Sequence, residues 1–475
     1  MRNLTMLTDL YQLTMMNAYL SAGKADEQAI FDVFYRPALG LEFAVAAGLE
    51  QAIDYINNLH FSDADIEYLR SLNCFNEAFF ERLKTFKFSG DIYAVREGDI
   101  VFPSEPILTV KAPLFEAQLI ETALLNIINH QTLIATKTAK MVQETEGGIA
   151  EFGLRRAQGP DAGIYGARAS MIGGCKSTSN VFAGQMFGIK ISGTHAHSWV
   201  MSFESELEAF RKYAEVYPDN CLLLVDTYDT LGSGVPNAIK VFDEISAKGY
   251  QPVGIRLDSG DLAYLSKKAR EMLDAAGYPQ AKIFASGDID ENILVSLKAQ
   301  GARIDAWGIG TKLITAAPNP ALGGVYKLAG IVKDGVIEPK MKVSNTPEKT
   351  TNPGFKTTYR IYKEDGMAAA DLIALKDEVF DTSKPLTIFH PLETWKKKTF
   401  EKYSMRELAI PIYRAGKQVY EIPALDETIA FAAKSKGEFW DEYRRLTNPH
   451  IYKVDLSDGL FELKRKLINQ AHGVE

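Results

Sequence analysis

Five apolar segments in the middle of the chain are each followed at once by residues that can bind anions, hold metal ions or move protons. In chain order, these are Thr194, His195 and His197 in KISGTHAHSW, Asp226 and Asp229 in CLLLVDTYDT, Arg256, Asp258 and Asp261 in PVGIRLDSGD, Gly287 and Asp288 in KIFASGDID, and Gly308, Gly310 and Thr311 in IDAWGIGTKL. Carboxylates, a guanidinium group and Gly-rich turns together suit an anionic substrate that carries phosphate.

The spacing of these clusters indicates repeated strand–loop–helix units. Thr194 to Asp226 and Asp226 to Asp258 are each 32 residues, Asp258 to Asp288 is 30, and Asp288 to Gly310 is 22. Units of this length build a parallel barrel or a doubly wound sheet, in which ligands bind at the carboxyl ends of the strands. The Gly-rich loops after the last two strands favour a phosphate held by backbone N–H groups.

Cationic residues also follow an earlier predicted strand. Arg155 and Arg156 stand in IAEFGLRRAQGPDAG, and guanidinium groups clamp phosphate in a fork geometry. Adjacent side chains at a strand end point to opposite sides, so a surface ion pair is the alternative. Lys176 and the following STSN could surround an anion at a helix start, although Ser, Thr and Asn also cap helices with no ligand present.

His195 and His197 admit three roles. On a strand their spacing puts both side chains on one face, where they could bind a metal ion, but no third ligand is nearby in the sequence. A lone histidine can be structural, and a histidine can also act as a nucleophile toward a phosphoryl donor. The pairing and the position at a strand end favour the functional roles.

The segment RLDSGD combines a cation with two carboxylates. Arg256 could meet a carboxylate or a phosphate, and Asp258 could accept hydrogen bonds from ribose hydroxyls. Asp226, Asp229 and Asp261 could help to hold Mg²⁺, which takes oxygen ligands. Each aspartate could instead cap the helix of the following unit.

The regions on either side of these units predict different elements. Residues 1 to about 90 are mainly helical by pattern, and TDLYQLTMMNAYLSAG predicts a helix capped by Thr8 or Asp9 and ended at Gly23. AIFDVFYR predicts a strand, residues 91–113 a small antiparallel sheet, and the sequence from Phe115 a long helix. After Lys327 the pattern is turn-rich and strand-like, with a hairpin signal at Asp334-Gly335, and a pair of helices is expected at about 427–445 and 459–471.

We therefore expect an N-terminal α/β domain over residues 1–125, a barrel domain over 126–330 and a C-terminal extension over 331–475. A structural cap that packs on the first domain is the expected role of the extension, with a direct part in substrate binding as the alternative.

Composition excludes several classes of protein. The net charge of −8 argues against a general nucleic-acid binder, whose surface would be basic. Three scattered cysteines without a CxxC pair disfavour a structural zinc site and fit a reducing, cytoplasmic setting. Neither a signal peptide nor an apolar run of about 18 residues is present, so no membrane span is expected.

In their order, the motifs TDLYQLTM, FGLRRAQGPDAG, GTHAHSW, RLDSGD, ASGDID, GIGTKL and GGVYKL resemble the nicotinate phosphoribosyltransferase family over roughly residues 5–330. The resemblance implies an irregular TIM-like α/β barrel packed against an α/β sandwich built from the N-terminal and C-terminal segments. It also implies a homodimer with sites at the subunit interface. The implied reaction, in NAD biosynthesis and salvage, joins nicotinate to 5-phosphoribosyl 1-diphosphate, giving nicotinate mononucleotide and diphosphate. ATP would be a co-substrate and Mg²⁺ a cofactor.

The same resemblance implies a role for each matching residue. Nicotinate would lie between Tyr11 of the neighbouring subunit and Phe152, and would be contacted by Thr194 and Arg256. Arg155 would contact the phosphoribosyl donor, Asp258 would hold the ribose hydroxyls, and the phosphate pocket would be shaped by Gly287, Asp288, Gly310 and Thr311. His197 would be phosphorylated by ATP, with His195 as its neighbour. The assignment of Asp226 and Asp261 to Mg²⁺ rests on their residue type and position alone.

The nearest alternative is a nicotinamide phosphoribosyltransferase. An amide prefers a carboxylate in the ring pocket, whereas KSTSNVFAG contains no acid and favours a substrate with a carboxylate. A quinolinate enzyme would need further cations, and a non-catalytic barrel would leave buried charges unused at a cost in stability. Some family members carry a cysteine-rich C-terminal site, which this chain cannot form because no cysteine follows Cys221.

Overall fold

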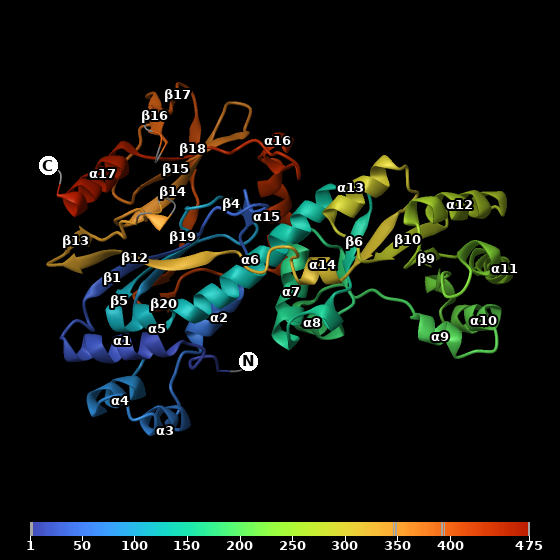
Figure 1. The fold of residues 1–475 in the computed structure, drawn as a ribbon, viewed down its shortest axis with the longest axis horizontal. Helices are drawn as coiled ribbons and strands as arrows, with labels where there is room; N and C mark the ends of the chain where they lie inside the picture. Colours follow the sequence, from blue (N-terminus) through green and yellow to red (C-terminus); the bar gives the residue numbers. More distant parts are fainter. Residues whose placement is uncertain (1–2, 345, 347–348, 391–392, 394, 474–475) are drawn as a thin grey trace. The chain divides into compact units, whose positions relative to one another are not determined.

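A computed structural model describes residues 3–344, 346, 349–390, 393 and 395–473 (Figure 1). The chain forms two compact units. The first contains Met1–Leu133 and Ala321–Glu475, and the second contains Ile134–Pro320. The boundary at residue 133 falls inside the long helix α6 (Glu121–Gln143).

The first unit contains two large β-sheets. The seven-stranded sheet is antiparallel throughout, in the order β13 (Val336–Pro339), β12 (Gly324–Lys333), β1 (Gln28–Tyr35), β5 (Leu108–Pro113), β3 (Asp91–Val95), β19 (Ala409–Arg414) and β20 (Lys417–Gln418). The six-stranded sheet has the order β17 (Lys397–Phe400), β16 (Leu386–Phe389), β21 (Val454–Leu456), β15 (Ala368–Leu375), β14 (Lys356–Tyr362) and β18 (Ser404–Glu407). Strands from both ends of the chain therefore build one unit, as the expected sandwich requires.

Helices complete the first unit. They are α1 (Leu10–Ser21), α2 (Leu49–Asn57), α3 (Asp63–Ser71), α4 (Glu77–Lys84), α5 (Leu114–Leu119), α15 (Leu425–Gly437), α16 (Asp441–Arg444) and α17 (Asp458–His472). The first of them follows its local signals closely. Asp9 is its N-cap residue, with its backbone N–H bonded to the side chain of Gln12, and Gly23 lies just beyond its end with φ of +69°.

The predicted small sheet over residues 91–113 is wrong in its extent. Its strands β3 and β5 do pair with each other, but both belong to the seven-stranded sheet, and β4 (Ile100–Val101) pairs with β2 (Ala44–Val45). The hairpin predicted at Asp334-Gly335 is confirmed, because both residues have positive φ and join β12 to β13. The expected pair of C-terminal helices is also present, as α15 and α17.

A buried network of charges joins the two ends of the chain in this unit. Arg360 is fully buried and donates two hydrogen bonds to Asp371, at 3.0 and 2.7 Å, and one to Asp99 at 3.0 Å. Arg406 donates to the other oxygen of Asp99 at 2.7 Å. Glu105 is also fully buried, and its pKa is raised well above the ordinary value by loss of hydration and by the charge of Asp371.

We expect Glu105→Gln to stabilise the protein at alkaline pH relative to the unchanged chain. Because the pKa of Glu105 is higher in the folded than in the unfolded state, folding takes up a proton, and stability falls as pH rises above the unfolded pKa of about 4.3. Glutamine removes that dependence. Urea unfolding from about pH 5 to pH 8 should show the advantage of the variant growing steadily as pH rises. Glu67→Gln, at an exposed position, is the control, and parallel stability profiles for the two variants would contradict the expectation.

The second unit is built around a parallel sheet. Its order is β7 (Ser177–Thr178), β6 (Gly148–Glu151), β11 (Ala306–Ile309), β10 (Lys282–Gly287), β9 (Gly254–Leu257) and β8 (Leu222–Leu224). A parallel bridge from Thr178 to Ile191 adds one more position beside β7. From β6 through β7 and Ile191 to β8, β9, β10 and β11, neighbours in the sheet are thus also neighbours in the chain. The last strand, β11, pairs with the first, β6, which is the strand order of a barrel. Within this unit, the one step without backbone pairing lies between Ile191 and β8.

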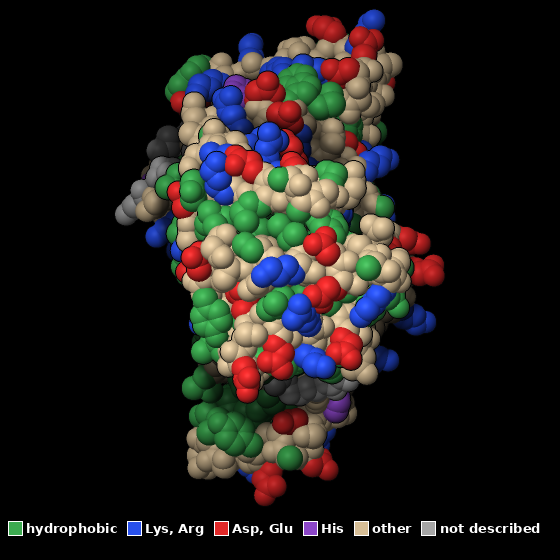
Figure 2. All heavy atoms as spheres, turned by 90° about the vertical axis from the view of Figure 1, so that its right-hand side faces the viewer, with side chains coloured by type: hydrophobic (Ala, Val, Ile, Leu, Met, Phe, Trp, Pro, Cys, Tyr) green, Lys and Arg blue, Asp and Glu red, His purple; other side chains and the backbone are tan. Residues whose placement is uncertain are grey.

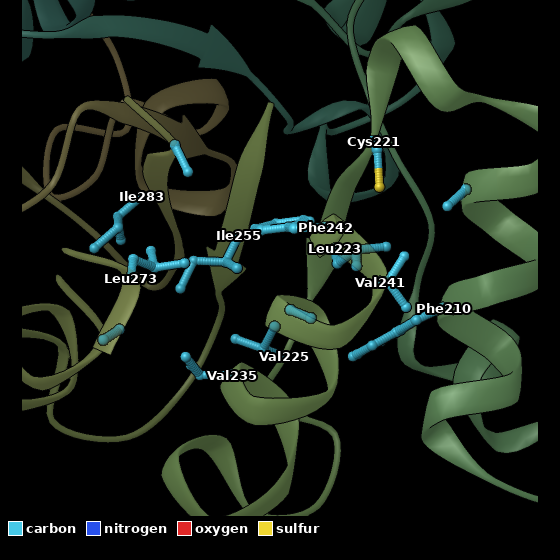
Figure 3. Close-up of a cluster of buried hydrophobic side chains, with 14 of the residues drawn as sticks. Phe210, Cys221, Leu223, Val225, Val235, Val241, Phe242, Ile255, Leu273 and Ile283 are labelled. Atoms are coloured by element: carbon cyan, nitrogen blue, oxygen red, sulfur yellow. The ribbon is translucent and has the colours of Figure 1, made fainter. Parts of the chain in front are cut away.

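Helices and short turns connect these strands. They are η1 (Leu154–Arg156), α7 (Pro160–Gly173), α8 (Val181–Phe187), α9 (His197–Met201), α10 (Glu206–Val216), η2 (Pro218–Asn220), η3 (Thr230–Gly234), α11 (Val235–Ser246), α12 (Leu262–Ala275), α13 (Glu291–Ala299) and α14 (Thr311–Ile314). Buried side chains from α10 and α11 meet those of the strands, and in Figure 3 Phe210, Val241 and Leu223 point toward one another. This core fixes the strand ends, and truncating a fully buried Phe in it would cost about 3–5 kcal/mol.

The outer surface of the second unit carries charges of both signs. Figure 2 shows Lys and Arg side chains interspersed with Asp and Glu on the face turned to the viewer. On α10 to α12 they form pairs such as Arg211 with Glu244 and Lys268 with Glu271. Among the helices that the structure describes, none is both long enough and apolar enough to cross a lipid bilayer.

Candidate active site

The predicted strand ends lie together at one edge of the parallel sheet. Asp258 follows β9 directly, Gly287 ends β10, Gly310 follows β11, and Phe152 follows β6. Asp226 stands two residues beyond β8. Because neighbouring strands of this sheet are parallel, their carboxyl ends share one edge, as the spacing of the motifs predicts.

The strand expected before Thr194 does not form. Ile191 makes a single bridge, and residues 192–196 are irregular, so His195 and His197 do not share the face of a strand. The imidazole of His195 lies instead at the unpaired step of the sheet, where its Nε2 accepts a hydrogen bond from the backbone N–H of Leu224 at 3.4 Å. Burial lowers the pKa of His195 to about 4, which keeps the ring neutral and able to accept that bond.

His197 is held at the start of α9, with part of its ring exposed. Its Nδ1 lies 3.1 Å from the hydroxyl of Thr227, and its Nε2 lies 3.8 Å from Oδ2 of Asp258. The side chain is 38% exposed, so a ring nitrogen can be approached from solution while two neighbours fix its orientation. This is the arrangement that a nucleophilic histidine needs.

Asp258 and Asp226 are joined by a network of hydrogen bonds. Asp226 Oδ2 accepts from the backbone N–H of Asp258 at 2.9 Å and from the hydroxyl of Ser259 at 2.6 Å. Asp258 Oδ1 accepts a short hydrogen bond from Ser286. Asp226 Oδ1 is buried and has no donor among the residues that the structure describes. A buried oxygen of this kind suits a cation or a ligand hydroxyl.

Arg256 is the partly buried cation of the site. Its Nη1 donates to the hydroxyl of Thr194 at 2.8 Å and its Nη2 to the carbonyl oxygen of His195 at 3.1 Å. Its Nε is buried, and the described part of the chain supplies no acceptor for it. Burial lowers the pKa of Arg256, and the nearby charges of Asp258 and Asp226 act in the opposite direction. The guanidinium group can therefore still accept an anionic partner.

Phe152 lies over the end of β11. Its backbone N–H donates to the carbonyl oxygen of Ile309 at 2.8 Å, and its ring covers Gly308. A Cβ atom at Gly308 would lie 2.5 Å from the Phe152 ring, so only glycine fits there. The partly exposed ring offers a flat apolar surface beside the strand ends.

Other predicted residues have exposed or local positions. Arg155 and Arg156 are exposed on η1, four or more residues after Glu151 ends β6. Asp261 caps α12 by accepting from the backbone N–H of Tyr264 at 3.0 Å, and Asp229 caps η3 in the same way.

The remaining predicted residues lie at loop and helix starts. Asp288 is exposed after β10, and Thr311 begins α14 with Gly310 as its N-cap residue. Near Lys176, the side chain of Asn180 caps α8 by accepting a hydrogen bond from the backbone N–H of Ala183 at 3.0 Å. The segment STSN thus has the helix-capping role that was the alternative to anion binding. Tyr11 belongs to the first unit, where partial burial and Glu121 raise its pKa to about 12.

The structure adds polar residues that the motifs did not single out. Thr227, Ser259 and Ser286 orient the histidine and the two aspartates. Glu151 is fully buried at the end of β6, where it bonds to Gly153 and, at 2.6 Å, to Thr178, and burial raises its pKa. The one sequence feature that could have identified these four residues is that each lies next to a predicted acid or at a strand end. Among the described residues, no cluster of three or more His, Cys, Asp and Glu side chains is arranged to hold a metal ion.

Comparisons with known proteins cover nearly the whole chain. Residues 148–381 match the nicotinate phosphoribosyltransferase (NAPRTase) family, 6–129 its N-terminal domain and 355–464 its C-terminal domain. The nicotinate phosphoribosyltransferase of Bacillus subtilis (strain 168) is 48% identical over 472 residues, which is 98% of this chain and 96% of that protein.

Comparisons with a human protein point to the same family. The nicotinate phosphoribosyltransferase of Homo sapiens is 34% identical over 97% of this chain and 96% of its own. The crystal structure of human nicotinic acid phosphoribosyltransferase superimposes with a TM-score of 0.86 at 31% identity, covering 97% of this chain and 99% of that one. The mixed α/β fold class predicted from the motifs is thereby confirmed, and the chain belongs to the nicotinate phosphoribosyltransferase family.

Proposed function

We propose that this enzyme joins nicotinate to 5-phosphoribosyl 1-diphosphate, giving nicotinate mononucleotide and diphosphate, and couples the reaction to ATP hydrolysis. Its place would be in NAD biosynthesis and salvage, as a cytoplasmic homodimer with sites at the subunit interface. The observation that carries the proposal is Arg256, a partly buried guanidinium group at the strand ends whose buried Nε–H has no acceptor among the described residues. The full-length relatives named for this activity support it.

Arg256 would bind the carboxylate of nicotinate. A carboxylate can accept hydrogen bonds from a guanidinium group while neutralising a charge that is costly to bury. Thr194 would contribute its hydroxyl beside Arg256, to which it is already bonded. Phe152 would cover one face of the pyridine ring, and Tyr11 of the neighbouring subunit the other. Nicotinamide, which lacks the carboxylate, would leave Arg256 without an anionic partner.

The pyridine nitrogen would then attack C1 of the ribosyl donor as the bond to diphosphate breaks. Asp258 would hold the ribose hydroxyls, and Arg155 would contact the donor. Gly287, Asp288, Gly310 and Thr311 would shape the phosphate pocket after the last two strands. No protein nucleophile is needed for this step, because holding the two reactants in line supplies much of the rate.

Mg²⁺, when bound, neutralises the charge that develops on the diphosphate leaving group. Asp226 fits it best, because its buried Oδ1 is without a described donor, and Asp261 retains the oxygen that does not cap α12. Both aspartates supply the oxygen ligands that this ion prefers.

His197 would carry the coupling to ATP. A ring nitrogen attacks the γ-phosphorus, a N–P bond forms, and the P–O bond to ADP breaks. Water later cleaves the N–P bond and releases phosphate. Thr227 and Asp258 would hold the imidazole in position before the attack, since each lies against one of its nitrogens, and the attacking nitrogen would leave its neighbour as the N–P bond forms.

The direct test measures product formation from nicotinate and the ribosyl donor with Mg²⁺, with and without ATP, beside a nicotinamide control. Turnover of nicotinate that ATP enhances is the expected result. Turnover of nicotinamide at a comparable rate would favour the alternative, nicotinamide phosphoribosyltransferase. Absence of turnover with either ring would reject the catalytic assignment.

We expect Gly287→Ala to lower turnover by about 100-fold, the scale on which a displacement of about 1 Å acts on reacting groups. Gly287 has φ of +122°, and a Cβ atom there would lie 2.9 Å from the carbonyl oxygen of Asp258, forcing that residue to move. Gly277→Ala is the control, because Gly277 also has a positive φ, +87°, but open space around it. Equal activity losses in the two variants would show that backbone strain alone is responsible.

A further inference from the structure

The first unit contains a cavity of about 200 Å³, and all of its lining residues belong to that unit. Its lining comes from β1, β14, β15, β21 and α17, and includes Asp32, Lys356, Ile373, Leu456, Lys464 and Asn352. A water molecule occupies about 30 Å³ of the liquid, so the cavity has room for several waters or for a small ion.

Two lysines line this cavity, although lysines are seldom buried. Lys356 is 4% exposed and Lys464 is 7% exposed. Lys356 has a carboxylate partner, since its Nζ lies 2.7 Å from Oδ2 of Asp32, and it also donates to the carbonyl oxygen of Gly354 at 2.8 Å. The second oxygen of Asp32 accepts from Thr109 at 2.7 Å, so this carboxylate is engaged on both oxygens by Lys356 and Thr109.

Lys464 has no carboxylate partner among the described residues. Its Nζ donates to the amide oxygen of Asn352 at 2.9 Å, which is the only acceptor that the described part of the chain gives it. Burial and the charge of Lys356 lower the pKa of Lys464 to about 8. Asp32, Lys356 and Lys464 together leave one positive charge without a counter-charge in the described lining.

A buried ammonium group without an anion is costly, and an anion within reach would remove that cost. The cavity also offers neutral donors, because the hydroxyl-bearing side chains of Ser104 and Thr350 line it. We propose that this cavity binds a small tetrahedral oxyanion, either inorganic phosphate or the phosphate group of a small phosphomonoester, with Lys464 as its main cationic contact. This proposal goes beyond the catalytic function and does not depend on it.

The test compares Lys464→Met with Lys466→Met, a substitution of an exposed lysine on the same helix. Isothermal titration of the full chain with inorganic phosphate, and separately with ribose 5-phosphate, should show one more phosphate bound per chain in the control. Lys464→Met should lose that site or weaken it by at least tenfold. Phosphate that binds elsewhere, including at the strand ends of the second unit, binds to both variants and therefore does not contribute to the difference between their isotherms. Identical isotherms for the two variants with both ligands would overturn the proposal.

A second measurement uses the unchanged protein, in case Lys464→Met does not fold. The amino groups are acetylated briefly near pH 8, with and without phosphate, and each lysine is read by peptide mass spectrometry. A bound oxyanion keeps Lys464 protonated and covered, so its labelling should slow by at least threefold, while labelling of Lys466 stays constant. Equal labelling of Lys464 with and without either ligand would contradict the site.

Discussion

His197→Asn should reduce ADP formation by at least about 10³-fold, as removal of a covalent nucleophile does in other enzymes, while leaving slow transfer that needs no ATP. Asparagine cannot form the N–P bond, but its amide can still reach toward Thr227, which lies 3.1 Å from the histidine ring. The loss would therefore report on the nucleophile and not on a collapsed loop. The measurement is the ratio of ADP to nicotinate mononucleotide, together with transfer of label from γ-labelled ATP to the chain.

Thr227→Val is the matched variant for this experiment. It keeps the histidine and removes only the hydroxyl that orients it, so label should still reach the chain, at a rate lower by roughly tenfold, in line with the loss of one hydrogen bond of about 1 kcal/mol or slightly more. If His197→Asn still took up label or kept ADP formation tied to product, the phosphohistidine would have to be placed elsewhere.

The strand ends of the second unit could be predicted from local sequence, for a physical reason. Short apolar runs such as those ending at Leu224, Leu257 and Ile309 are buried, and one α-helix lies between each two successive strands from β8 to β11. The residues that follow each run must then emerge at the same edge. This periodicity alone is enough to predict the strand-end positions of Asp226, Asp258, Gly287 and Gly310, and the structure has them there.

The segment around Thr194 could not be predicted in this way. The segment KISGT alternates like a strand, yet the chain makes only one β-bridge there, at Ile191. Between Ile191 and β8 the contacts are made by side chains instead of by backbone pairing. Arg256 reaches across 62 residues of sequence to Thr194, and His195 across 29 residues to Leu224. Contacts at this separation leave no trace in local periodicity.

The first unit shows the same limit. The hairpin at Asp334-Gly335 is encoded locally by two residues that tolerate positive φ, and it was predicted. The partners of β3 could not be foreseen, because β19 begins more than 300 residues later in the chain. The role of Lys464 could not be predicted from the sequence either, since the same helix carries Lys466 at an exposed position and only packing distinguishes the two.

Arg256→Met should raise the KM for nicotinate by roughly 10²- to 10³-fold and change the KM for the ribosyl donor by no more than about threefold. Truncating one partner of a buried charge pair costs about 2–5 kcal/mol, and every 1.4 kcal/mol is a factor of ten. Methionine fills a similar volume, so most of the loss would come from the missing charge and hydrogen bonds to the carboxylate. Initial rates with each substrate varied in turn give both constants.

Two comparisons make this result specific to the carboxylate. Nicotinamide has no carboxylate to lose, so its weak turnover should change little in Arg256→Met, and the preference for nicotinate over nicotinamide should shrink by nearly the full factor. Arg256→Lys keeps a cation but loses the planar guanidinium group that also bonds Thr194 and His195. Its KM for nicotinate should therefore lie between those of the unchanged enzyme and Arg256→Met. Because Arg256 also joins the unpaired step of the sheet, thermal unfolding of each variant must accompany the kinetics. A stable Arg256→Met protein with an unchanged KM for nicotinate would remove this residue from the carboxylate site, and its guanidinium group would then be a structural bridge across the gap.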